Sequence, residues 1–323
     1  MLDEGGASVN EPAGVMELEV VELRLEAAGV LSVALADPER RLLPVWGPGA
    51  HVDLGLPEHV RQYSLCGDVG DRQHYRIAVL REPSSSGGSE YVHEVLRPGE
   101  LVEVGGPRNH FALVEAEQYV FVAGGIGITP LLPMIRAVEA AGRPWRLAYG
   151  GRGKASMAFL DVLARYGERV SVWPADEVGL IDLASVIGPP QDGVAVYCCG
   201  PEPLLAAVEA QCAGWPQGAL HLERFKAKPR EDVDPEDERP FDVVLERSKL
   251  RVRVPADRTA LDALDDAGVE VPNACRDGVC GSCEVTVLAG IPDHRDSVLP
   301  PDHTGSIMLC VSRARSSDLV LDL

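Results

Sequence analysis

Four of the eight cysteines lie in the last quarter of the chain, at a spacing that suits an iron–sulfur cluster. Cys275, Cys280 and Cys283 follow the pattern C-x4-C-x2-C, and Cys310 comes later. In the plant-type [2Fe–2S] pattern, one loop supplies three thiolates and a distant segment supplies the fourth. Gly278 lets that loop adopt conformations that a Cβ would resist, and lets amide groups approach the sulfurs. The sequence therefore predicts a [2Fe–2S] cluster held by these four cysteines.

A zinc site suits these four cysteines less well. Structural zinc sites usually pair their ligands as two short C-x2-C knuckles, and this segment contains only one such pair. Four unrelated buried cysteines are the second alternative. Neither accounts for the spacing as well as the cluster does.

Residues 61–65 read Arg-Gln-Tyr-Ser-Leu and combine groups that a flavin nucleotide requires. Tyr63 can stack on a planar ring, Ser64 can meet the polar edge of that ring near N5, and Arg61 can bind a phosphate bidentately. The alternative is an ordinary strand in which Tyr63 and Leu65 share a core face. Five residues alone favour that alternative, and the motifs in the rest of the chain reverse the balance.

Residues 84–89 read Ser-Ser-Ser-Gly-Gly-Ser and precede a short helix expected at 90–96. Backbone amides and a hydroxyl at the start of a helix form an anion site. Gly87, Gly88 and Ser89 are therefore candidates for an anion site. A flexible Ser/Gly loop is the alternative, chiefly for residues 84–86.

Residues 123–130, Ala-Gly-Gly-Ile-Gly-Ile-Thr-Pro, lie between a buried strand expected at 119–123 and a helix expected at 129–141. Such glycines permit a tight turn and the close approach of a pyrophosphate to backbone amides. The motif is not the Rossmann G-x-G-x-x-G. A tight strand–helix turn also needs glycines, so the motif does not by itself prove nucleotide binding.

Further signals for a nicotinamide coenzyme follow at the ends of later strands. Residues 197–201 read Tyr-Cys-Cys-Gly-Pro, and Arg152 and Lys154 follow the strand expected at 145–149. Two cations could favour a 2′-phosphate on the adenosine ribose. NADPH therefore stays open as the coenzyme.

These residues must be positioned by three kinds of structure. Residues 15–114 contain short strands and frequent turn signals, which favour an antiparallel barrel. From residue 118, apolar strands alternate with helices (157–166 and 203–211 among them), which implies a parallel sheet. We expect domains at 1–114, 115–227 and 239–323, with the acidic stretch 228–238 as an extended linker.

Composition narrows the possible partners. The formal net charge of −20 makes nucleic acid and anionic lipid poor partners, while an acidic docking face and plain solubility both stay open. No apolar run approaches the ~20 residues that span a bilayer. The acidic N-terminus does not read as a signal peptide. We expect a cytoplasmic protein with reduced thiols that works as a monomer.

Taken together, the motifs resemble those of the phthalate dioxygenase reductase family, and the resemblance covers nearly the whole chain. Residues 61–65 match the R-x-Y-S-x pattern of ferredoxin reductase-type flavin domains. Residues 124–130 match their G-G-x-G-x-T-P form, and residues 290–299 are similar to the family's segment after the third cluster ligand. The resemblance implies a multidomain fold: an antiparallel β-barrel flavin domain, an α/β parallel-sheet nucleotide domain and an α+β ferredoxin (β-grasp) domain.

The resemblance also implies cofactors and site residues. FMN rather than FAD is expected, together with NADH and the [2Fe–2S] cluster. Ser64, Cys199 and Phe225 are expected near the hydride path, with Phe225 covering the flavin face, although a core phenylalanine accounts for Phe225 about as well. The residues expected to bind the organic cofactors are Arg61, Gln62, Tyr63, Ser64, Gly87, Gly88, Ser89, Gly124, Gly125, Gly127, Thr129, Arg152, Gly200, Pro201 and Phe225.

The function that follows is electron transfer to another protein. NADH gives two electrons at once, a [2Fe–2S] cluster accepts one, and a flavin handles both steps. The resemblance implies a terminal oxygenase of the Rieske type as acceptor, for an aromatic acid or its methyl ether. A cytochrome P450 acceptor, a non-catalytic ferredoxin-like carrier and a quinone or flavin-only reductase are the alternatives.

Overall fold

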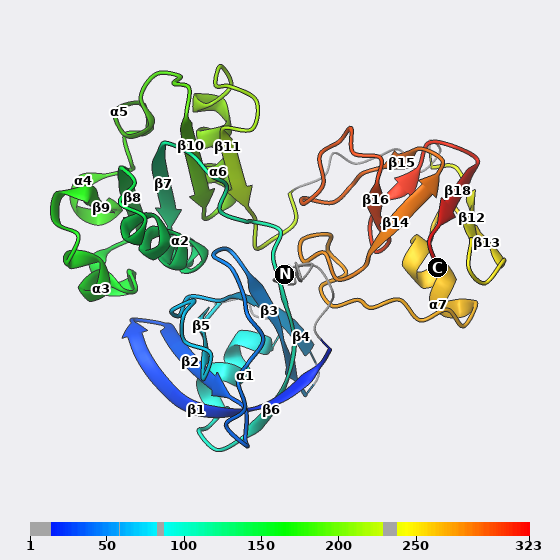
Figure 1. The fold of residues 1–323 in the computed structure, drawn as a ribbon, viewed down its shortest axis with the longest axis horizontal. Helices are drawn as coiled ribbons and strands as arrows, with labels where there is room; N and C mark the ends of the chain where they lie inside the picture. The colour runs from blue at the N-terminus through cyan, green and yellow to red at the C-terminus, as the bar shows by residue number, and fades with distance from the viewer. Residues whose placement is uncertain (1–13, 58, 83–86, 229–237) are drawn as a thin grey trace, which may run out of the picture. The chain divides into compact units, whose positions relative to one another are not determined.

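The computed structural model describes residues 14–57, 59–82, 87–228 and 238–323. The chain divides into two compact units, residues 1–223 and 224–323, and each unit is described by itself (Figure 1). No helix in the described ranges is long and apolar enough to cross a membrane.

The first unit begins with a six-stranded antiparallel sheet in the order β4-β3-β6-β1-β2-β5. The end strands meet, because the Cys66 amide that follows β4 donates to the Arg76 carbonyl oxygen of β5 at 2.8 Å, and the sheet curls into a barrel. The strands and the one helix are β1 (Met16–Ala27), β2 (Val30–Ala36), β3 (His51–Leu56), β4 (His59–Ser64), β5 (Tyr75–Leu80), α1 (Gly88–Glu94) and β6 (Leu101–Arg108).

The same unit continues into a five-stranded parallel sheet in the order β11-β10-β7-β8-β9. Its strands are β7 (Gln118–Gly124), β8 (Trp145–Gly151), β9 (Val170–Pro174), β10 (Val194–Cys199) and β11 (Leu220–Glu223). Its helices are α2 (Ile128–Ala140), α3 (Leu160–Ala164), α4 (Ala175–Val178), α5 (Leu183–Ile187) and α6 (Glu202–Gln211), with 3₁₀ turns η1 (Gly125–Gly127), η2 (Lys154–Ser156) and η3 (Gly167–Arg169).

Helices on both faces explain why β7 is a continuous apolar run. Phe121 and Ala123 pack into the core that includes α2, whereas Val120 and Val122 pack into the core that includes α6. Since successive side chains of a strand point to opposite faces, every residue of the run is buried. The strand order also brings the carboxyl ends of β7, β8 and β10 to one edge of the sheet.

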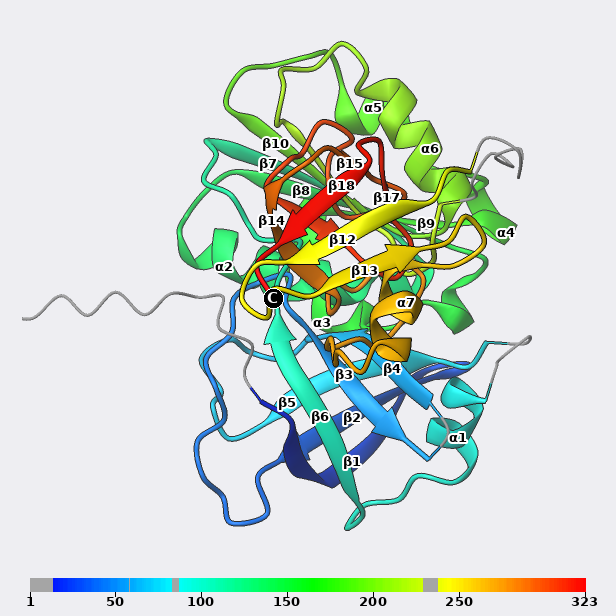
Figure 2. The same ribbon diagram turned by 90° about the vertical axis from the view of Figure 1, so that its right-hand side faces the viewer.

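The second unit holds a five-stranded sheet in the order β13-β12-β18-β14-β16, with α7 packed beside β13 (Figure 2). Its apolar core is its own. Thr259 caps α7, because its hydroxyl accepts from the Asp262 amide at 3.1 Å. The elements are β12 (Phe241–Leu245), β13 (Arg251–Val254), α7 (Ala260–Asp266), β14 (Glu284–Ala289), β15 (Pro292–Asp293), β16 (Ser306–Met308), β17 (Arg313–Ala314) and β18 (Asp318–Leu321).

The predicted fold class is confirmed, with local corrections. The helix predicted at 157–166 is wrong at both ends. Phe159 has φ +63°, and helix α3 spans only Leu160–Ala164. The short elements α4, α5 and β11 were not predicted. The domain boundaries stay predictions, and most of the acidic stretch, residues 229–237, lies outside the described residues.

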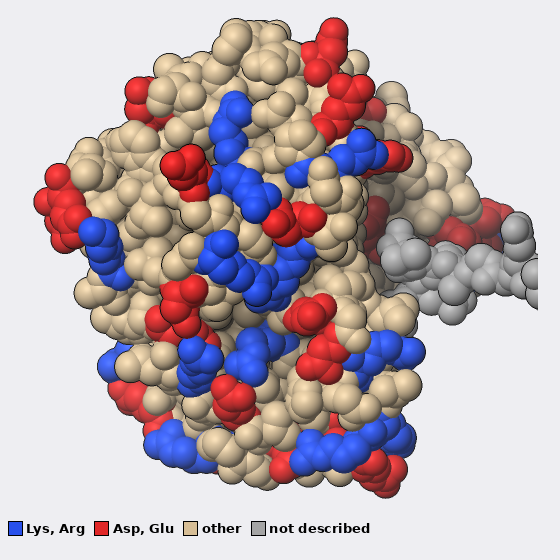
Figure 3. Space-filling view, turned by 60° about the vertical axis from the view of Figure 1, so that its left-hand side comes forward, with Lys and Arg blue, Asp and Glu red and all other residues tan. Residues whose placement is uncertain are grey.

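Charge is mixed on the face shown in Figure 3. Lys and Arg side chains gather across its middle, with Asp and Glu side chains among them. The surplus of acids therefore does not make this face uniformly negative.

Candidate functional site

The predicted flavin-binding residues 61–64 lie along β4, an end strand in the order of the antiparallel sheet. Tyr63 pairs with Val52 of β3, and Ser64 pairs with His51. Burial raises the pKa of the Tyr63 phenol to about 12, so the ring is neutral at physiological pH. Leu65 is buried in the core and Tyr63 is only partly buried. Tyr63 therefore keeps a ring surface outside the core, as stacking on a flavin requires.

Arg61 and the start of α1 come together from separate segments. A Cβ added at Gly88 would lie 2.8 Å from Cγ of Arg61 and 3.2 Å from its Nε, so the arginine lies directly against this glycine. Gly87, just before the helix, has φ +104°, which glycine adopts without strain. The Ser89 hydroxyl accepts from the Glu82 amide at 3.2 Å. A guanidinium beside backbone amides fits the phosphate of FMN.

The remaining predicted flavin residues have mixed outcomes. The Gln62 side-chain amide donates to Asp53 Oδ1 at 2.9 Å, and Arg108 also pairs with that oxygen at 2.6 Å. Gln62 thus holds β3 and β4 together. Residues 84–86 of the predicted phosphate loop lie outside the described residues.

Two glycine turns press against each other where β7 and β10 end. A Cβ at Gly127 would lie 2.2 Å from the carbonyl oxygen of Cys199, and one at Gly124 would lie 2.6 Å from Cδ of Pro201. Gly200 likewise faces Gly124, with 3.0 Å from its added Cβ to the Gly124 Cα. The two motifs are therefore one structural feature, which only glycine can build.

The predicted nucleotide residues around this feature differ in what they offer. Gly125 has φ +54° and open space where a Cβ would point, so its backbone can be approached closely. Thr129 is buried, and its hydroxyl donates to the Ile126 carbonyl oxygen at 3.0 Å. The hydroxyl of Thr129 thus serves the turn itself.

The loop after β8 carries the two cations expected near the adenosine ribose. Arg152 is exposed, but Lys154 Nζ lies 2.7 Å from Glu177 Oε2 of α4. A Cβ at Gly153 would lie 2.5 Å from Oδ2 of Asp176. Two carboxylates thus border this loop, and the charge of Lys154 is balanced, which weakens the sequence argument for a 2′-phosphate.

Ser64, Cys199 and Glu223 converge from three strands, and the role of Glu223 was missed by the sequence reasoning. Cys199 and Glu223 are register partners at the ends of the parallel strands β10 and β11. Cys199 Sγ lies 3.9 Å from Glu223 Oε2. The buried Ser64 hydroxyl has no hydrogen bond of good geometry within the described residues, which fits a position where a cofactor's polar edge supplies the bond.

Burial keeps the acid and the thiol of this cluster neutral. It raises the pKa of the Glu223 carboxyl to about 8, with the Ser64 hydroxyl and the Cys199 thiol acting in the opposite direction. Burial, followed by the Glu223 carboxyl, raises the pKa of Cys199 well above its ordinary value. Cys199 is therefore a thiol that packs against the site, and Glu223 is an acid that can hold a proton there.

Phe225 is not brought to this cluster by any described contact. It is exposed and falls in the second unit of the chain. Its predicted place over the flavin stays a prediction. Cys198, by contrast, is packed in the core on the face of the parallel sheet opposite Cys199.

The four predicted cluster ligands meet in the second unit. Cys280, Cys283 and Cys310 are buried and Cys275 is partly exposed. Gly278 and Gly281 of the connecting loop have φ +70° and +72°. The sequence therefore folds the loop through left-handed conformations that favour glycine.

The thiols lie within hydrogen-bonding range of one another. Hydrogen bonds from Cys280 and then Cys310 lower the pKa of Cys275, and Cys283 is a neighbour of Cys310. The Asp277 amide donates to Cys275 Sγ at 3.3 Å. In the described ranges no three His, Cys, Asp or Glu side chains gather as closely as a single metal ion requires. Three cysteines from one loop and a fourth from a distant segment suit the plant-type [2Fe–2S] cluster predicted from their spacing.

Comparisons with known proteins agree with this assignment. The family model described as a 2Fe-2S iron-sulfur cluster binding domain matches residues 243–315. The chain is 44% identical over 314 residues to phenoxybenzoate dioxygenase subunit beta of Ectopseudomonas oleovorans, covering 95% of this chain and 97% of that one. It is 39% identical over 318 residues to phthalate dioxygenase reductase of Burkholderia cepacia, covering 96% and 98%.

Solved structures give the same picture. The crystal structure of phthalate dioxygenase reductase matches with a TM-score of 0.70 and 39% identity over 96% of this chain and 98% of that chain. An intact type IV self-sufficient cytochrome P450 monooxygenase matches with a TM-score of 0.91 and 46% identity over 96% of this chain. The chain spans only 41% of that P450 protein.

Proposed function

This chain belongs to the phthalate dioxygenase reductase family, and we propose that it passes electrons from NADH through FMN and a [2Fe–2S] cluster to a separate oxygenase. The observation that carries the proposal is a four-cysteine cluster site on the same chain as a two-sheet unit with phosphate-binding and nucleotide-binding turns. A cluster that takes one electron at a time needs a one-electron outlet, which a protein acceptor provides. Relatives that match over 96% of this chain are named as reductases of dioxygenase systems.

FMN, when bound, supplies the conversion between a two-electron hydride and single electrons. The chain's own residues bind and orient it. Arg61, with Gly88 at the start of α1, would hold the phosphate, and Tyr63 would offer its ring for stacking. The Ser64 hydroxyl, which has no hydrogen bond of good geometry among the described residues, would donate to the polar edge of the ring.

The nicotinamide end is held by the paired glycine turns and by the neutral acid beside them. Gly125 leaves its backbone open to the pyrophosphate. Cys199 packs its thiol against the site, and Glu223 keeps a proton on its carboxyl at neutral pH because its pKa lies at about 8. A neutral acid adds no negative charge where a hydride must arrive.

The acceptor we propose is a Rieske-type oxygenase for an aromatic acid or its ether. The chain acts as a monomer in the cytoplasm and binds neither nucleic acid nor membrane. Support comes from the names of its relatives, which act with dioxygenases and an O-demethylase, and from the net charge of −20.

The test uses the full chain loaded with FMN, iron and sulfide. NADH should bleach both the flavin and the cluster absorbance, and oxygenase reduction should exceed reduction of a P450 or a quinone at equal acceptor concentration. Protein that holds the cluster but is not bleached by NADH would be a carrier rather than a reductase. Faster reduction of the P450 or of the quinone would contradict the proposed acceptor.

A further inference from the structure

Asp296 lies behind the cluster loop with its side chain fully buried, and nothing in the proposed function employs it. The exposed fraction of this side chain is 0%, and that of its neighbour His294 is 2%. A buried carboxylate is costly unless its oxygens are satisfied. Its contacts therefore indicate what it stabilises.

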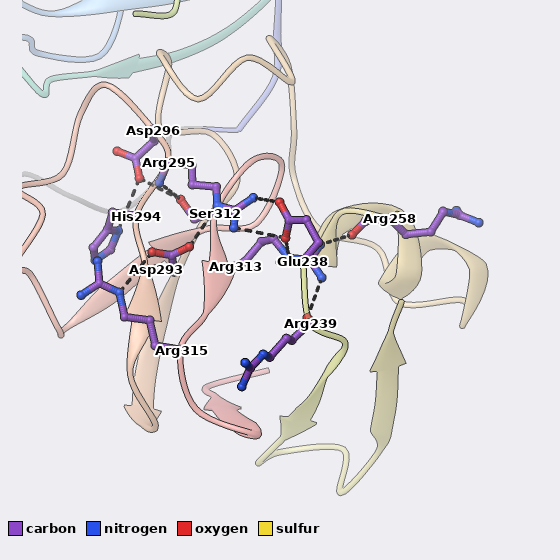
Figure 4. Close-up of polar contacts among 10 residues, drawn as sticks. All are labelled: Glu238, Arg239, Arg258, Asp293, His294, Arg295, Asp296, Ser312, Arg313 and Arg315. Carbon is purple, nitrogen blue, oxygen red and sulfur yellow. Dashed lines mark hydrogen bonds and ion pairs between the residues drawn. The ribbon is translucent and has the colours of Figure 1, made fainter. Parts of the chain in front are cut away.

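Every partner of the Asp296 carboxylate is a donor or a ring nitrogen. Oδ1 accepts from the Val298 amide at 2.9 Å and from the Leu299 amide at 2.6 Å. Oδ2 accepts from the Ser312 hydroxyl at 3.0 Å and lies 3.4 Å from His294 Nδ1 (Figure 4). Such an environment suits an ionised carboxylate.

These contacts join the two segments that supply the cluster ligands. Ser312 follows Cys310 by two residues and also accepts from the Arg295 amide at 3.0 Å. On the other side, the Ser297 amide donates to the Gly278 carbonyl oxygen at 2.8 Å. A Cβ at Gly278 would lie 3.0 Å from the Cα of Asp296, so the ligand loop rests directly on this residue.

The arginines around Asp296 are paired with other acids. Arg295 pairs with Glu238 and, at 3.0 Å, with Asp293, while Arg313 Nε lies 2.9 Å from Glu238 (Figure 4). In the part of the chain that the structure describes, no lysine or arginine pairs with Asp296. Its negative charge is therefore not offset by a cationic side chain of fixed charge.

We propose that Asp296 is a positioning residue for the cluster: its carboxylate fastens the Cys275–Cys283 loop to the segment of Cys310, and its charge opposes the arrival of an electron. The inference rests on the proposed [2Fe–2S] site. A buried charge close to the cluster makes reduction less favourable, because Coulomb interactions are weakly screened in the protein interior.

The experiment compares four forms of the full chain, purified without oxygen: wild type, Asp296→Asn, Ser312→Ala and Asp302→Asn. The readouts are iron and sulfide content, the EPR spectrum of the reduced cluster, its midpoint potential and its rate of loss in air. Asp302 is an exposed acid of the same unit, so its variant makes the same charge change at the surface. Ser312→Ala removes two hydrogen bonds, one to the Asp296 carboxylate and one from the Arg295 amide, and keeps the Asp296 charge.

Asp296→Asn should raise the ratio of reduced to oxidised cluster at the wild-type midpoint by on the order of tenfold, which is ~59 mV for a one-electron couple. Ser312→Ala should shift the potential far less, but lose its cluster several times faster than wild type. Asp302→Asn should match wild type in both.

If Asp296→Asn takes up its cluster and the midpoint potential equals that of Asp302→Asn, the proposed role of the charge is overturned. If Asp296→Asn fails to take up a cluster, the Ser312→Ala variant tests the positioning role. A cluster in Ser312→Ala that lasts as long in air as the wild-type cluster would overturn that role. Wild type without iron and sulfide would instead refute the proposed function, before any variant is compared.

Discussion

At the scale of single residues, the two proposed electron-handling sites depend on side chains of opposite character. The predicted cluster site needs thiolates that bind iron, and its four cysteines lie beside one another. The site of Ser64, Cys199 and Glu223 instead keeps its groups neutral by burial. Changing one residue in each should therefore give separable effects.

Replacing Cys280 by Ser should lower electron transfer to the oxygenase by more than about 100-fold, since a lost ligand costs more than a lost outer contact. NADH oxidation by small dyes should persist, because dyes can take electrons from the flavin. Both rates are measured on folded protein. The matched control is Cys212→Ser, a buried cysteine of the first unit, which should change neither. Loss of dye reduction in a folded Cys280→Ser protein would contradict the proposed order of electron flow.

The raised pKa of Glu223 predicts that the stability of the protein depends on pH. Its carboxyl has a pKa of about 8 when folded and roughly 4.3 when unfolded. Between these two pH values the folded state binds more protons than the unfolded state. The contribution of Glu223 to the free energy of unfolding therefore falls as the pH rises through that window. In thermal melts of FMN-saturated protein from pH 5 to 8.5, Glu223→Gln should lose less stability with rising pH than wild type. An identical pH profile for the two proteins would refute this, and Glu168→Gln, an exposed acid, is the control.

At the scale of elements, the site depends on how closely strand ends approach each other. The turn after β7 and the turn after β10 touch through glycines, and β10 and β11 set the register of Cys199 with Glu223. A side chain inserted into this contact must separate the strand ends.

Replacing Gly127 by Ala should destabilise the protein by about 1–3 kcal/mol and weaken NADH binding more than FMN binding. The reason is that its Cβ would lie 2.2 Å from the Cys199 carbonyl oxygen. Denaturant unfolding and coenzyme titration measure the two effects. Gly214→Ala is the matched control, since the nearest atom to its added Cβ is 3.9 Å away. Unchanged NADH affinity in Gly127→Ala would argue against the role of this turn.

Helix α7 offers a test of the second unit. Thr259→Ala removes the hydroxyl that accepts from the Asp262 amide and should cost about 1 kcal/mol of unfolding free energy. Thr304→Ala, at an exposed position of the same unit, should cost little. Equal losses in the two variants, measured by chemical denaturation, would show that the cap contributes nothing.

At the scale of the whole molecule, the two units have separate apolar cores. The residues expected to bind FMN and NADH, apart from Phe225, lie in the first unit, and the cluster ligands lie in the second. Electron uptake and electron delivery are thus assigned to different units of the chain.

A chain that ends at Glu223 should therefore keep NADH-dependent dye reduction, within about threefold of the full chain, while oxygenase reduction disappears, because each core can form without the other. Steady-state rates with a dye and with the oxygenase measure this. A truncated protein that folds and still reduces the oxygenase would show that electrons leave directly from the flavin.

Much of the site could be read from the sequence, because its parts are local. Cys275, Cys280 and Cys283 sit in one short loop, so their spacing alone predicts the ligand set. The glycines of residues 124–127 mark a tight turn for the same reason. Such motifs depend on backbone geometry over a few residues, which the order of residue types specifies.

Other features arise only from tertiary structure. Glu223 looks like any strand-end acid until β11 pairs with β10 and places its carboxyl beside Cys199. The sequence made Lys154 a candidate cation for a 2′-phosphate, and it placed Glu238 in an extended acidic linker. The fold instead pairs Lys154 with Glu177 of α4, and pairs Glu238 with Arg295 and Arg313.

The difference has a physical cause. A motif of adjacent residues carries its geometry in the chain, so the sequence by itself determined the glycine turns and the fold class, and it predicts the cluster ligands. A charge or a proton responds to whatever the fold places beside it, across tens of residues of chain. The burial of Glu223, the pairing of Lys154 and the place of Asp296 behind the cluster loop were therefore decided only by tertiary structure.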